Sequence, residues 1–178
     1  MRTNLLLSDL NVGVGAADGR RIEVVASGLP CFRGAQLAVD ITLRGVLGAD
    51  GEPHASAAST DGVVANSARA DKERVYPEFV QGRRCNLVVL GIETGGRWSD
   101  EAVDFLRTLA ESKARGTTPL LRRAAERNWI RRWARVIATA CSTAFVASLV
   151  DKESRADAHL LDGAAPCLEG LFGAARCE

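Results

Sequence analysis

The stretch QLAVDITL, residues 36–43, has the composition of a buried strand but carries a carboxylate in its middle. Its β-branched and apolar residues are typical of a strand packed inside a sheet. Asp40 lies between Val39 and Ile41, where an ionised side chain costs free energy unless a partner compensates its charge. The stretch therefore predicts a central strand, and Asp40 marks either a structural ion pair or a functional site.

Two more stretches have the pattern of strands. RIEVVAS, residues 21–27, precedes the first stretch and is joined to it by GLPCFRG, whose glycines and proline suit a hairpin-like connection. CNLVVLGIE, residues 85–93, is an almost unbroken apolar run of the kind that is buried on both faces of a sheet. These stretches predict a small sheet with residues 35–43 next to residues 21–27.

Helical spacing dominates the remaining core of the sequence. From Asp61, mostly apolar residues and one lysine recur every three or four positions, which places them on one face of a helix. Pro77 is expected to end this helix near Tyr76. That face consists of Val64, Ala68, Lys72, Tyr76 and Phe79. A second helix is predicted from the cap residue Ser99 to about Lys113. A longer one is predicted from about Thr118 to Val150.

The order strand, strand, helix, strand, helix, helix predicts an α/β protein, with α+β as the alternative class. We expect a small mixed β-sheet flanked by helices. The expected organisation is an N-terminal helix end and loop over residues 1–20, a core over 21–116, a long amphipathic helix packed on the core over 117–150, and a loose tail over 151–178.

Composition narrows the functional classes. With 178 residues, of which 47% are hydrophobic, the chain can bury the core of one domain. The five cysteines are scattered and never form a CxxC pair, and the two histidines are isolated, so we expect neither zinc nor a disulfide framework. The apolar runs are too short for a membrane span or a signal peptide, so we expect an intracellular protein without a membrane partner.

Glu23 and Asp40 form the first candidate site. They lie on the two strands that we expect to pair, with sixteen residues between them, so their carboxylates can converge at one end of the sheet. Two nearby carboxylates repel unless a cation lies between them, and such pairs commonly hold Mg²⁺. The alternative is structural: Glu23 would pair with Arg20 or Arg21, and Asp40 with a helix lysine or arginine.

Lys72 and Tyr76 extend this candidate site. A spacing of four places both on the face of the helix that is otherwise apolar and directed toward the core. A lysine and a phenol near two buried acids suit a phosphate site, because lysine can neutralise charge on a phosphoryl oxygen. In the alternative interpretation, Lys72 extends beside Glu73 or Asp71 and Tyr76 is a core aromatic residue.

The ordered set RIEVV, GAQLAVDITL, KERVYPEF and LVVLGIETGGRWSDEAVDFLRTLA resembles the restriction-like endonuclease domain at the C-terminal end of non-LTR retrotransposon reverse-transcriptase proteins. That domain belongs to the PD-(D/E)xK nuclease superfamily. The resemblance covers roughly Leu10 to Leu149, and its most specific parts are the VDITL strand, the K…Y helix and the ETGGRW turn.

The resemblance implies a restriction-endonuclease-like core and a role for each site residue. Glu23 matches the first metal ligand, Asp40 the second acid, Lys72 the lysine that has moved onto a helix, and Tyr76 the tyrosine that follows it. Such domains nick target DNA with Mg²⁺ (or Mn²⁺), and the freed 3′ hydroxyl primes reverse transcription. The chain departs from the pattern at Thr42, where the wider superfamily has lysine, so activity would depend on Lys72.

The resemblance also departs at the start of the first motif and at the start of the chain. Ile22 and Glu23 stand where the family has proline and aspartate, which keeps the charge but lengthens the reach of the ligand. The chain begins at a methionine with no polymerase before it, as a truncated or decayed element would. A reverse-transcriptase domain on a longer parent polypeptide is therefore the expected partner besides DNA.

Arginines supply the candidate DNA contacts. Arg97 follows Gly95-Gly96 before a helix and could add a bidentate contact to a phosphate, or it could lie in a local salt bridge. Residues 117–135 hold six arginines and one acid, Glu126. An arginine stripe suits the DNA backbone without reading sequence, whereas the alternative is a merely solvated basic face. The stripe consists of Arg123, Arg127, Arg131 and Arg135.

We expect Trp129 and Trp133, on the opposite side of the long helix, to pack it onto the domain. The sequence thus predicts a Mg²⁺-dependent DNA endonuclease domain of retrotransposon origin, nuclear if it acts on genomic DNA. The alternative is a catalytically inactive remnant that only binds nucleic acid through the basic helix. A structural α/β domain with ion-paired acids is the third interpretation.

Overall fold

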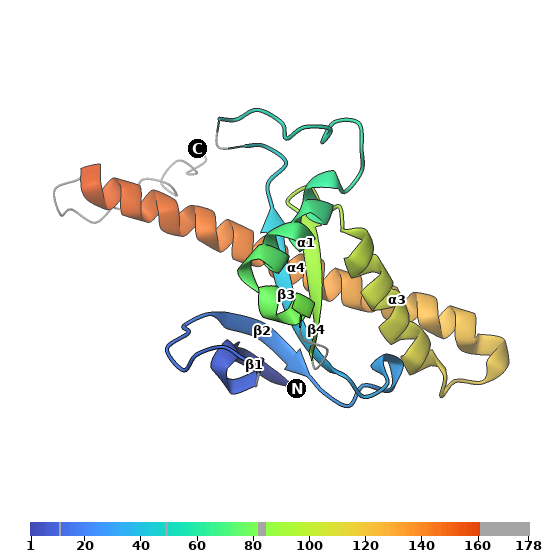
Figure 1. Cartoon of the computed structure of the whole chain (residues 1–178). Coiled ribbons are helices and arrows are strands. Elements are labelled where there is room, and N and C mark those ends of the chain that lie inside the picture. Colours follow the sequence, from blue (N-terminus) through green and yellow to red (C-terminus); the bar gives the residue numbers. More distant parts are fainter. Residues whose placement is uncertain (11, 49, 82–84, 161–178) are drawn as a thin grey trace, which may run out of the picture. The chain divides into compact units, whose positions relative to one another are not determined.

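The computed structural model describes residues 1–10, 12–48, 50–81 and 85–160, with side chains described up to Val150. The chain divides into two compact units, Met1–Thr139 and Ala140–Glu178. The first unit holds the sheet and the helices that pack on it (Figure 1). Of the second unit, the described part is the continuation of the last helix.

Four strands form one mixed sheet in the order β1-β2-β3-β4. Their bounds are β1 (Arg2–Leu6), β2 (Arg21–Ala26), β3 (Gln36–Arg44) and β4 (Cys85–Glu93). β1 and β2, and β2 and β3, pair antiparallel, whereas β3 and β4 run parallel over nine residue pairs. The α/β class and the mixed sheet predicted from the sequence are therefore confirmed.

The N-terminal residues correct one prediction. They form strand β1 and a short 3₁₀ helix, η1 (Leu7–Leu10), instead of the end of a helix. Leu5 pairs with Ile22 across the sheet, so tertiary pairing overrides the local preference. Asn4 has a φ of 53° in the middle of β1, and this interruption removes the regular alternation that identifies a strand in sequence.

The helices predicted after Asp61 and after Ser99 agree closely with their predicted positions. α1 (Val63–Val75) ends before Pro77, which begins the short helix α2 (Pro77–Gln81). α3 (Asp100–Ala114) is capped as expected, because the Ser99 side chain accepts a hydrogen bond from the backbone nitrogen of Ala102. Two 3₁₀ turns, η2 (Pro30–Phe32) and η3 (Pro119–Leu121), precede β3 and the last helix.

The last helix, α4 (Arg122–Leu160), is longer than predicted. It continues through residues 151–160, where the sequence predicts a loose tail. The rest of the predicted tail, residues 161–178, lies outside the described residues.

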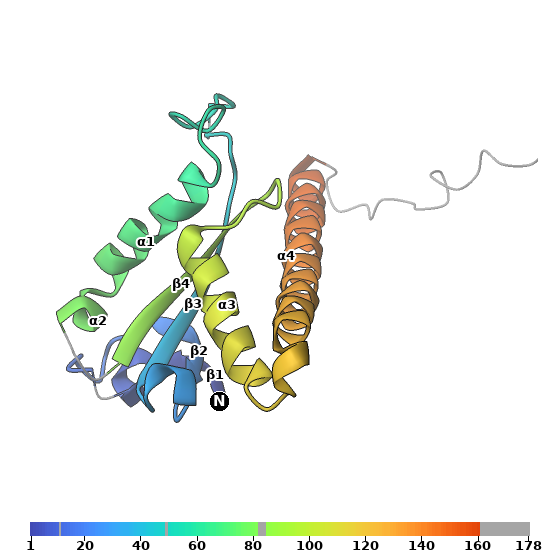
Figure 2. The same ribbon diagram turned by 90° about the vertical axis from the view of Figure 1, so that its right-hand side faces the viewer.

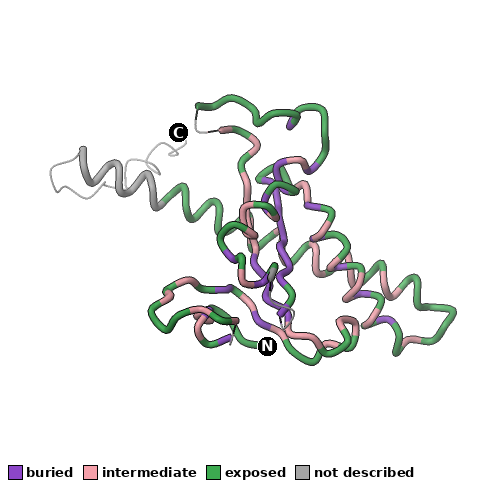
Figure 3. The backbone as a smooth tube through the Cα atoms, viewed as in Figure 1, coloured by how far each residue is buried: buried purple, intermediate pink, exposed green. Residues whose placement is uncertain are grey.

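The sheet carries α1 and α3 on opposite faces, as Figure 2 shows. Beneath α1 and α2 lies one apolar cluster, to which Ile22, Ala68 and Val89 belong. The cluster on the α3 face includes Leu37 and Leu90. Buried residues are concentrated along β3 and β4 (Figure 3), so these two strands are the rigid centre of the domain.

The outer edge of β4 is closed by side chains from both helices. Arg69 of α1 donates a hydrogen bond to the carbonyl oxygen of Leu87 at 3.0 Å, and the backbone nitrogen of Val89 donates one to Glu101 of α3 at 3.2 Å. Arg69 and Glu101 also form a 2.6 Å ion pair. These contacts satisfy backbone groups that would otherwise be open to pairing with another chain.

By length and composition alone, one helix among the described residues, Pro119–Val150, could cross a membrane. An 18-residue window within it reaches a mean hydropathy of 1.5. None of that window is buried within the structure, and one such helix is weak evidence for a membrane span. The absence of a membrane partner therefore stays a prediction.

Candidate active site

The ladder between β2 and β3 places the two acids side by side. Its last recorded pair is Val24 with Val39, and the next residues along the two strands are Glu23 and Asp40. Beyond that pair, Glu23 Oε2 accepts a hydrogen bond from the backbone nitrogen of Ile41 at 2.8 Å. The Glu23 side chain thus replaces a backbone partner of β3 where the backbone pairing of β2 and β3 ends. Glu23 and Asp40 both lie at this end of the pairing.

Asp40 is 1% exposed and its charge is compensated by Lys72. The Lys72 ammonium, from the inner face of α1, lies 2.7 Å from Asp40 Oδ1. The Thr42 hydroxyl donates a longer hydrogen bond of 3.4 Å to the same oxygen. The structure therefore contains the ion pair with a helix lysine that was one interpretation of Asp40. A buried ion pair of this kind can be structural or functional.

Glu23 reaches the surface, yet the protein around its carboxylate raises its pKa. Burial contributes most to this rise, and the negative charge of Asp40 adds to it, whereas the Ile41 hydrogen bond and the Lys72 ammonium act in the opposite direction. Within the described part of the chain, Glu23 forms no ion pair with Arg20 or Arg21, and the Arg21 guanidinium donates to the carbonyl oxygen of Asn4. Arg20 pairs with Asp18 and Glu78 instead.

Tyr76 completes the cluster from the C-terminal end of α1. Its hydroxyl donates a 2.8 Å hydrogen bond to the carbonyl oxygen of Arg21, and the Lys72 ammonium lies 5.9 Å from the centre of its ring. Burial contributes most to raising the pKa of Tyr76 to about 12, followed by the negative charge of Asp40, hydrogen bonding with Asp40, and the negative charge of Glu23. The phenol is therefore neutral over the physiological range and serves as a hydrogen-bond donor.

The donor set of this cluster fits a hard divalent cation. Glu23 and Asp40 offer carboxylate oxygens, which Mg²⁺ prefers. Burial, and after it the negative charge of Asp40, raises the pKa of Glu23, and a cation between the two carboxylates would offset both effects. Mg²⁺ commonly takes one or two protein carboxylates and keeps several waters. Among the described residues, no group of three or more histidines, cysteines, aspartates and glutamates could hold a metal ion.

Arg97 is engaged within the protein. Its Nε lies 3.0 Å from Glu93 Oε2, and its Nη1 lies 3.0 Å from Asp61 Oδ1. Glu93 is 2% exposed, and its Oε1 accepts hydrogen bonds from the backbone nitrogens of Val64 and Ala65 at the start of α1. The local salt bridge was one of the two interpretations of Arg97, and the structure contains it.

The arginine stripe of α4 is exposed along its whole length. It consists of Arg123, Arg127, Arg131 and Arg135. Trp129 and Trp133 are half-buried and lie with their ring centres 5.2 Å apart. The Lys113 ammonium of α3 lies 5.5 Å from the Trp129 ring centre, so this tryptophan faces α3. The stripe thus presents four cations to solvent, as its spacing predicts.

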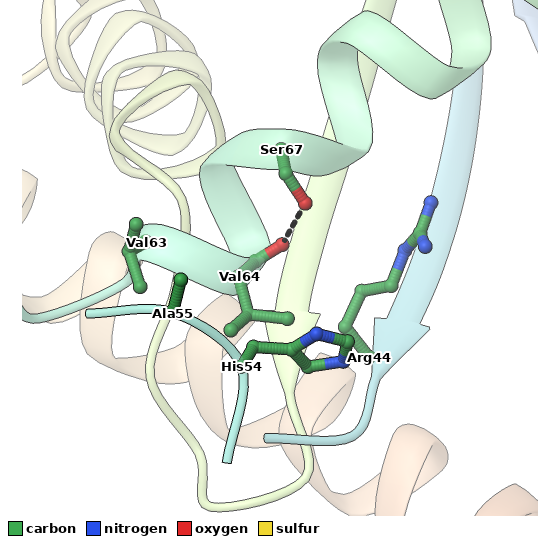
Figure 4. Close-up of a pocket in the computed structure, with 6 residues that line it drawn as sticks. All are labelled: Arg44, His54, Ala55, Val63, Val64 and Ser67. Carbon is green, nitrogen blue, oxygen red and sulfur yellow. Dashed lines mark hydrogen bonds between the residues drawn. The ribbon is translucent and has the colours of Figure 1, made fainter. Parts of the chain in front are cut away.

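Two pockets lie elsewhere on the first unit. One, of about 250 Å³, lies beside the first turns of α1 and is lined by Arg44, His54, Ala55, Val63, Val64 and Ser67 (Figure 4). The other, of about 380 Å³, includes Phe32 and Phe105 on the α3 face. Neither pocket is lined by Asp40, Lys72 or Tyr76. The site formed by Glu23, Asp40, Lys72 and Tyr76 is therefore distinct from both pockets.

The structure thus brings together Glu23, Asp40, Lys72 and Tyr76, whose roles stay predictions. Sequence reasoning missed the contribution of Thr42 to Asp40, which the D-x-T spacing could have indicated because residues i and i+2 share one face of a strand. It also missed Glu93 as the cap of α1.

Comparisons of the chain with family models, with curated proteins and with solved structures found no match.

Proposed function

We propose that this chain is a metal-dependent DNA endonuclease domain of the PD-(D/E)xK type and of retrotransposon origin. The observation that carries the proposal is the pairing of Asp40, 1% exposed on a central strand, with Lys72 from the facing helix. Glu23 on the neighbouring strand and Tyr76 at the end of the same helix complete the constellation. The residues that the resemblance names therefore have supporting geometry.

Glu23 and Asp40 would hold Mg²⁺ or Mn²⁺ through their carboxylate oxygens. When bound, the ion would supply an activated water and neutralise charge on the phosphate. Lys72 would place its ammonium against a phosphoryl oxygen, where negative charge grows during hydrolysis. Tyr76 would remain protonated, given its pKa of about 12, and would hold the strand that carries Glu23 through the Arg21 carbonyl.

DNA binding would come mainly from α4. Its four exposed arginines recur every four residues, and guanidinium groups bind phosphate well but carry no sequence information by themselves. Binding of this kind falls steeply as salt rises. The proposed reaction is the nicking of one target strand, whose free 3′ hydroxyl would prime a reverse transcriptase on a longer parent polypeptide.

An inactive remnant that only binds nucleic acid is the second candidate. One observation favours it: Asp40 already has a full counter-charge in Lys72, so the cluster is stable as a purely structural pair. The exposed arginines would be retained in either case. Binding of DNA alone therefore does not separate the two functions, and cleavage does.

The test is nicking of supercoiled plasmid by the purified chain, with Mg²⁺ and with EDTA. We expect nicking that needs Mg²⁺ and that falls by at least about a hundredfold in Glu23→Gln, because loss of one ligand charge weakens metal binding. Tyr76→Phe keeps the ring and removes only the hydroxyl, so a smaller loss is expected. DNA binding without nicking would favour the remnant, and nicking in EDTA would contradict a metal-dependent site.

A further inference from the structure

The Lys72 ammonium occupies the place beside Asp40 that a metal ion would need. Its Nζ lies 2.7 Å from Asp40 Oδ1, and the Asp40 side chain is 2% exposed, so the carboxylate is shielded from water. Mg²⁺ binds oxygen ligands at about 2.0–2.1 Å. An ion on this carboxylate would lie within a few ångströms of the ammonium, and the two positive charges would repel each other.

The side chain of Lys72 has room to leave. It is 23% exposed, so a path to solvent exists. Its acidic neighbours on α1 are already paired: Glu73 with Arg69 at 2.7 Å, and Asp71 with Arg44 at 2.5 Å. A displaced ammonium would therefore move toward water and the face of the Tyr76 ring, which is 5.9 Å away.

The charge balance favours exchange with a divalent ion. Two carboxylates share one ammonium at this site, because Glu23 lies next to Asp40 on the neighbouring strand. A monovalent ion that replaced the ammonium would leave the net charge of the site unchanged, so its binding would bring no electrostatic gain. A divalent ion would neutralise both carboxylates, which the ammonium alone does not do.

We propose that Lys72 is an exchangeable counter-ion of Asp40, which a divalent metal ion displaces and a monovalent ion does not. The displaced ammonium is then free to contact a phosphate of the substrate. This inference rests on the proposed function, because it concerns the same metal site.

The first test uses wild-type protein and Mn²⁺ alone. Lysines are acylated with a water-soluble reagent, and the extent at each site is read by mass spectrometry. Saturating Mn²⁺ is expected to raise the rate at Lys72 at least about fivefold, since a free amine reacts faster than a paired one. Lys113 on α3 is the internal control and should not change. NaCl at equal ionic strength should change neither, and an unchanged or slower Lys72 overturns the proposal.

The second test measures Mn²⁺ affinity by calorimetry. Lys72→Met should bind Mn²⁺ at least about tenfold more tightly than wild type, or about 1.4 kcal/mol, because no cation has to be displaced. Lys72→Arg should bind like wild type or more weakly, and Lys113→Met controls for net charge. Equal or weaker binding by Lys72→Met overturns the proposal.

Asp40→Asn separates the two hypotheses. Mn²⁺ binding that Asp40→Asn abolishes but Lys72→Met leaves unchanged would retain the metal site and refute only the counter-ion role. Failure of both wild type and Lys72→Met to bind Mn²⁺ would refute the metal site and the counter-ion role together. The labelling experiment needs no variant, so it decides the question even if a substitution prevents folding.

Discussion

The ammonium of Lys72 lies 2.7 Å from a carboxylate oxygen of Asp40, whose side chain is 2% exposed. Removing the lysine leaves a buried charge without its partner, whereas removing the acid leaves an ammonium that can turn to solvent. We therefore expect Lys72→Met to lower the free energy of unfolding by about 2 kcal/mol in EDTA. This loss is smaller than the loss expected for a fully buried ion pair, because Lys72 is partly exposed. Asp40→Asn should lower the free energy of unfolding by less than Lys72→Met does.

Urea unfolding of the two variants and of the double variant Lys72→Met/Asp40→Asn checks this asymmetry. The double variant should recover part of the stability lost in Lys72→Met, because no unpaired charge remains. A larger loss in Asp40→Asn than in Lys72→Met would contradict the pairing.

Gly91 lies where helix α1 approaches strand β4 closely. A Cβ added there would lie 2.3 Å from the carbonyl oxygen of Ala65 and 3.3 Å from the Cβ of Ser99. Gly91→Ala should therefore lower the free energy of unfolding by about 1–3 kcal/mol. The matched control is Gly95→Ala, because a Cβ at Gly95 would meet nothing within 4 Å. Equal urea midpoints for the two variants would show that α1 does not approach β4 as described.

Arg20 joins the segment before β2 to helix α2. Its Nη2 lies 2.6 Å from Asp18 and 2.5 Å from Glu78, and hydrogen bonds from Arg20 hold the pKa of both carboxyls below their ordinary values. Stability from a depressed pKa is present above the unfolded value and is lost as pH falls through the folded value. Glu78→Gln should thus lower the melting temperature at pH 7 by about 2 °C.

This difference from wild type should shrink as pH falls below the ordinary glutamate pKa and through the lowered pKa of Glu78, where the wild-type carboxyl becomes protonated as well. Melting curves of both proteins between pH 3 and pH 8 provide the measurement. A difference that stays constant across this range would mean that Glu78 acts through packing and not through its charge.

The proposed binding of DNA by the arginine stripe predicts a specific response to salt. Each phosphate contact that is lost should reduce the slope of log K against log salt concentration by about 0.9. Arg127→Gln/Arg131→Gln is therefore expected to reduce that slope by about 1.8, equally for unrelated duplexes. Arg107→Gln on α3 is the control, since its guanidinium pairs with Asp104 at the surface. An unchanged slope in the double variant would place the DNA contacts elsewhere.

Periodic patterns allowed most of the fold to be predicted. The apolar run of residues 85–93 coincides with β4, and the three- to four-residue spacing from Val64 to Phe79 gave the buried face of α1 and α2. Strand β1 was missed because the positive φ of Asn4 breaks its alternation. Whether the core matches the restriction-endonuclease-like core remains a prediction, since the strand order alone does not define one superfamily.

The sequence predicts the parts of the candidate site whose placement follows from the pairing of neighbouring strands or from one face of a helix. Glu23 and Asp40 come together because β2 and β3 pair as a hairpin, and Lys72 and Tyr76 because they share one face of α1. The capping of α1 by Glu93 was not predictable, because residues 29 positions apart meet only after β4 and α1 have packed. Local patterns carry no information about such contacts.

The most direct test of the proposed function is the nicking rate of Asp40→Asn on supercoiled plasmid in Mg²⁺, measured beside Asp104→Asn. Asp104 is a surface residue of α3 with a 69% exposed side chain, so its substitution should leave the rate unchanged. A metal ion held by Asp40 would supply several kcal/mol of transition-state stabilisation, so Asp40→Asn should lose at least about a thousandfold in rate. Equal nicking by the two variants, with both folded, would contradict a nuclease site at Asp40.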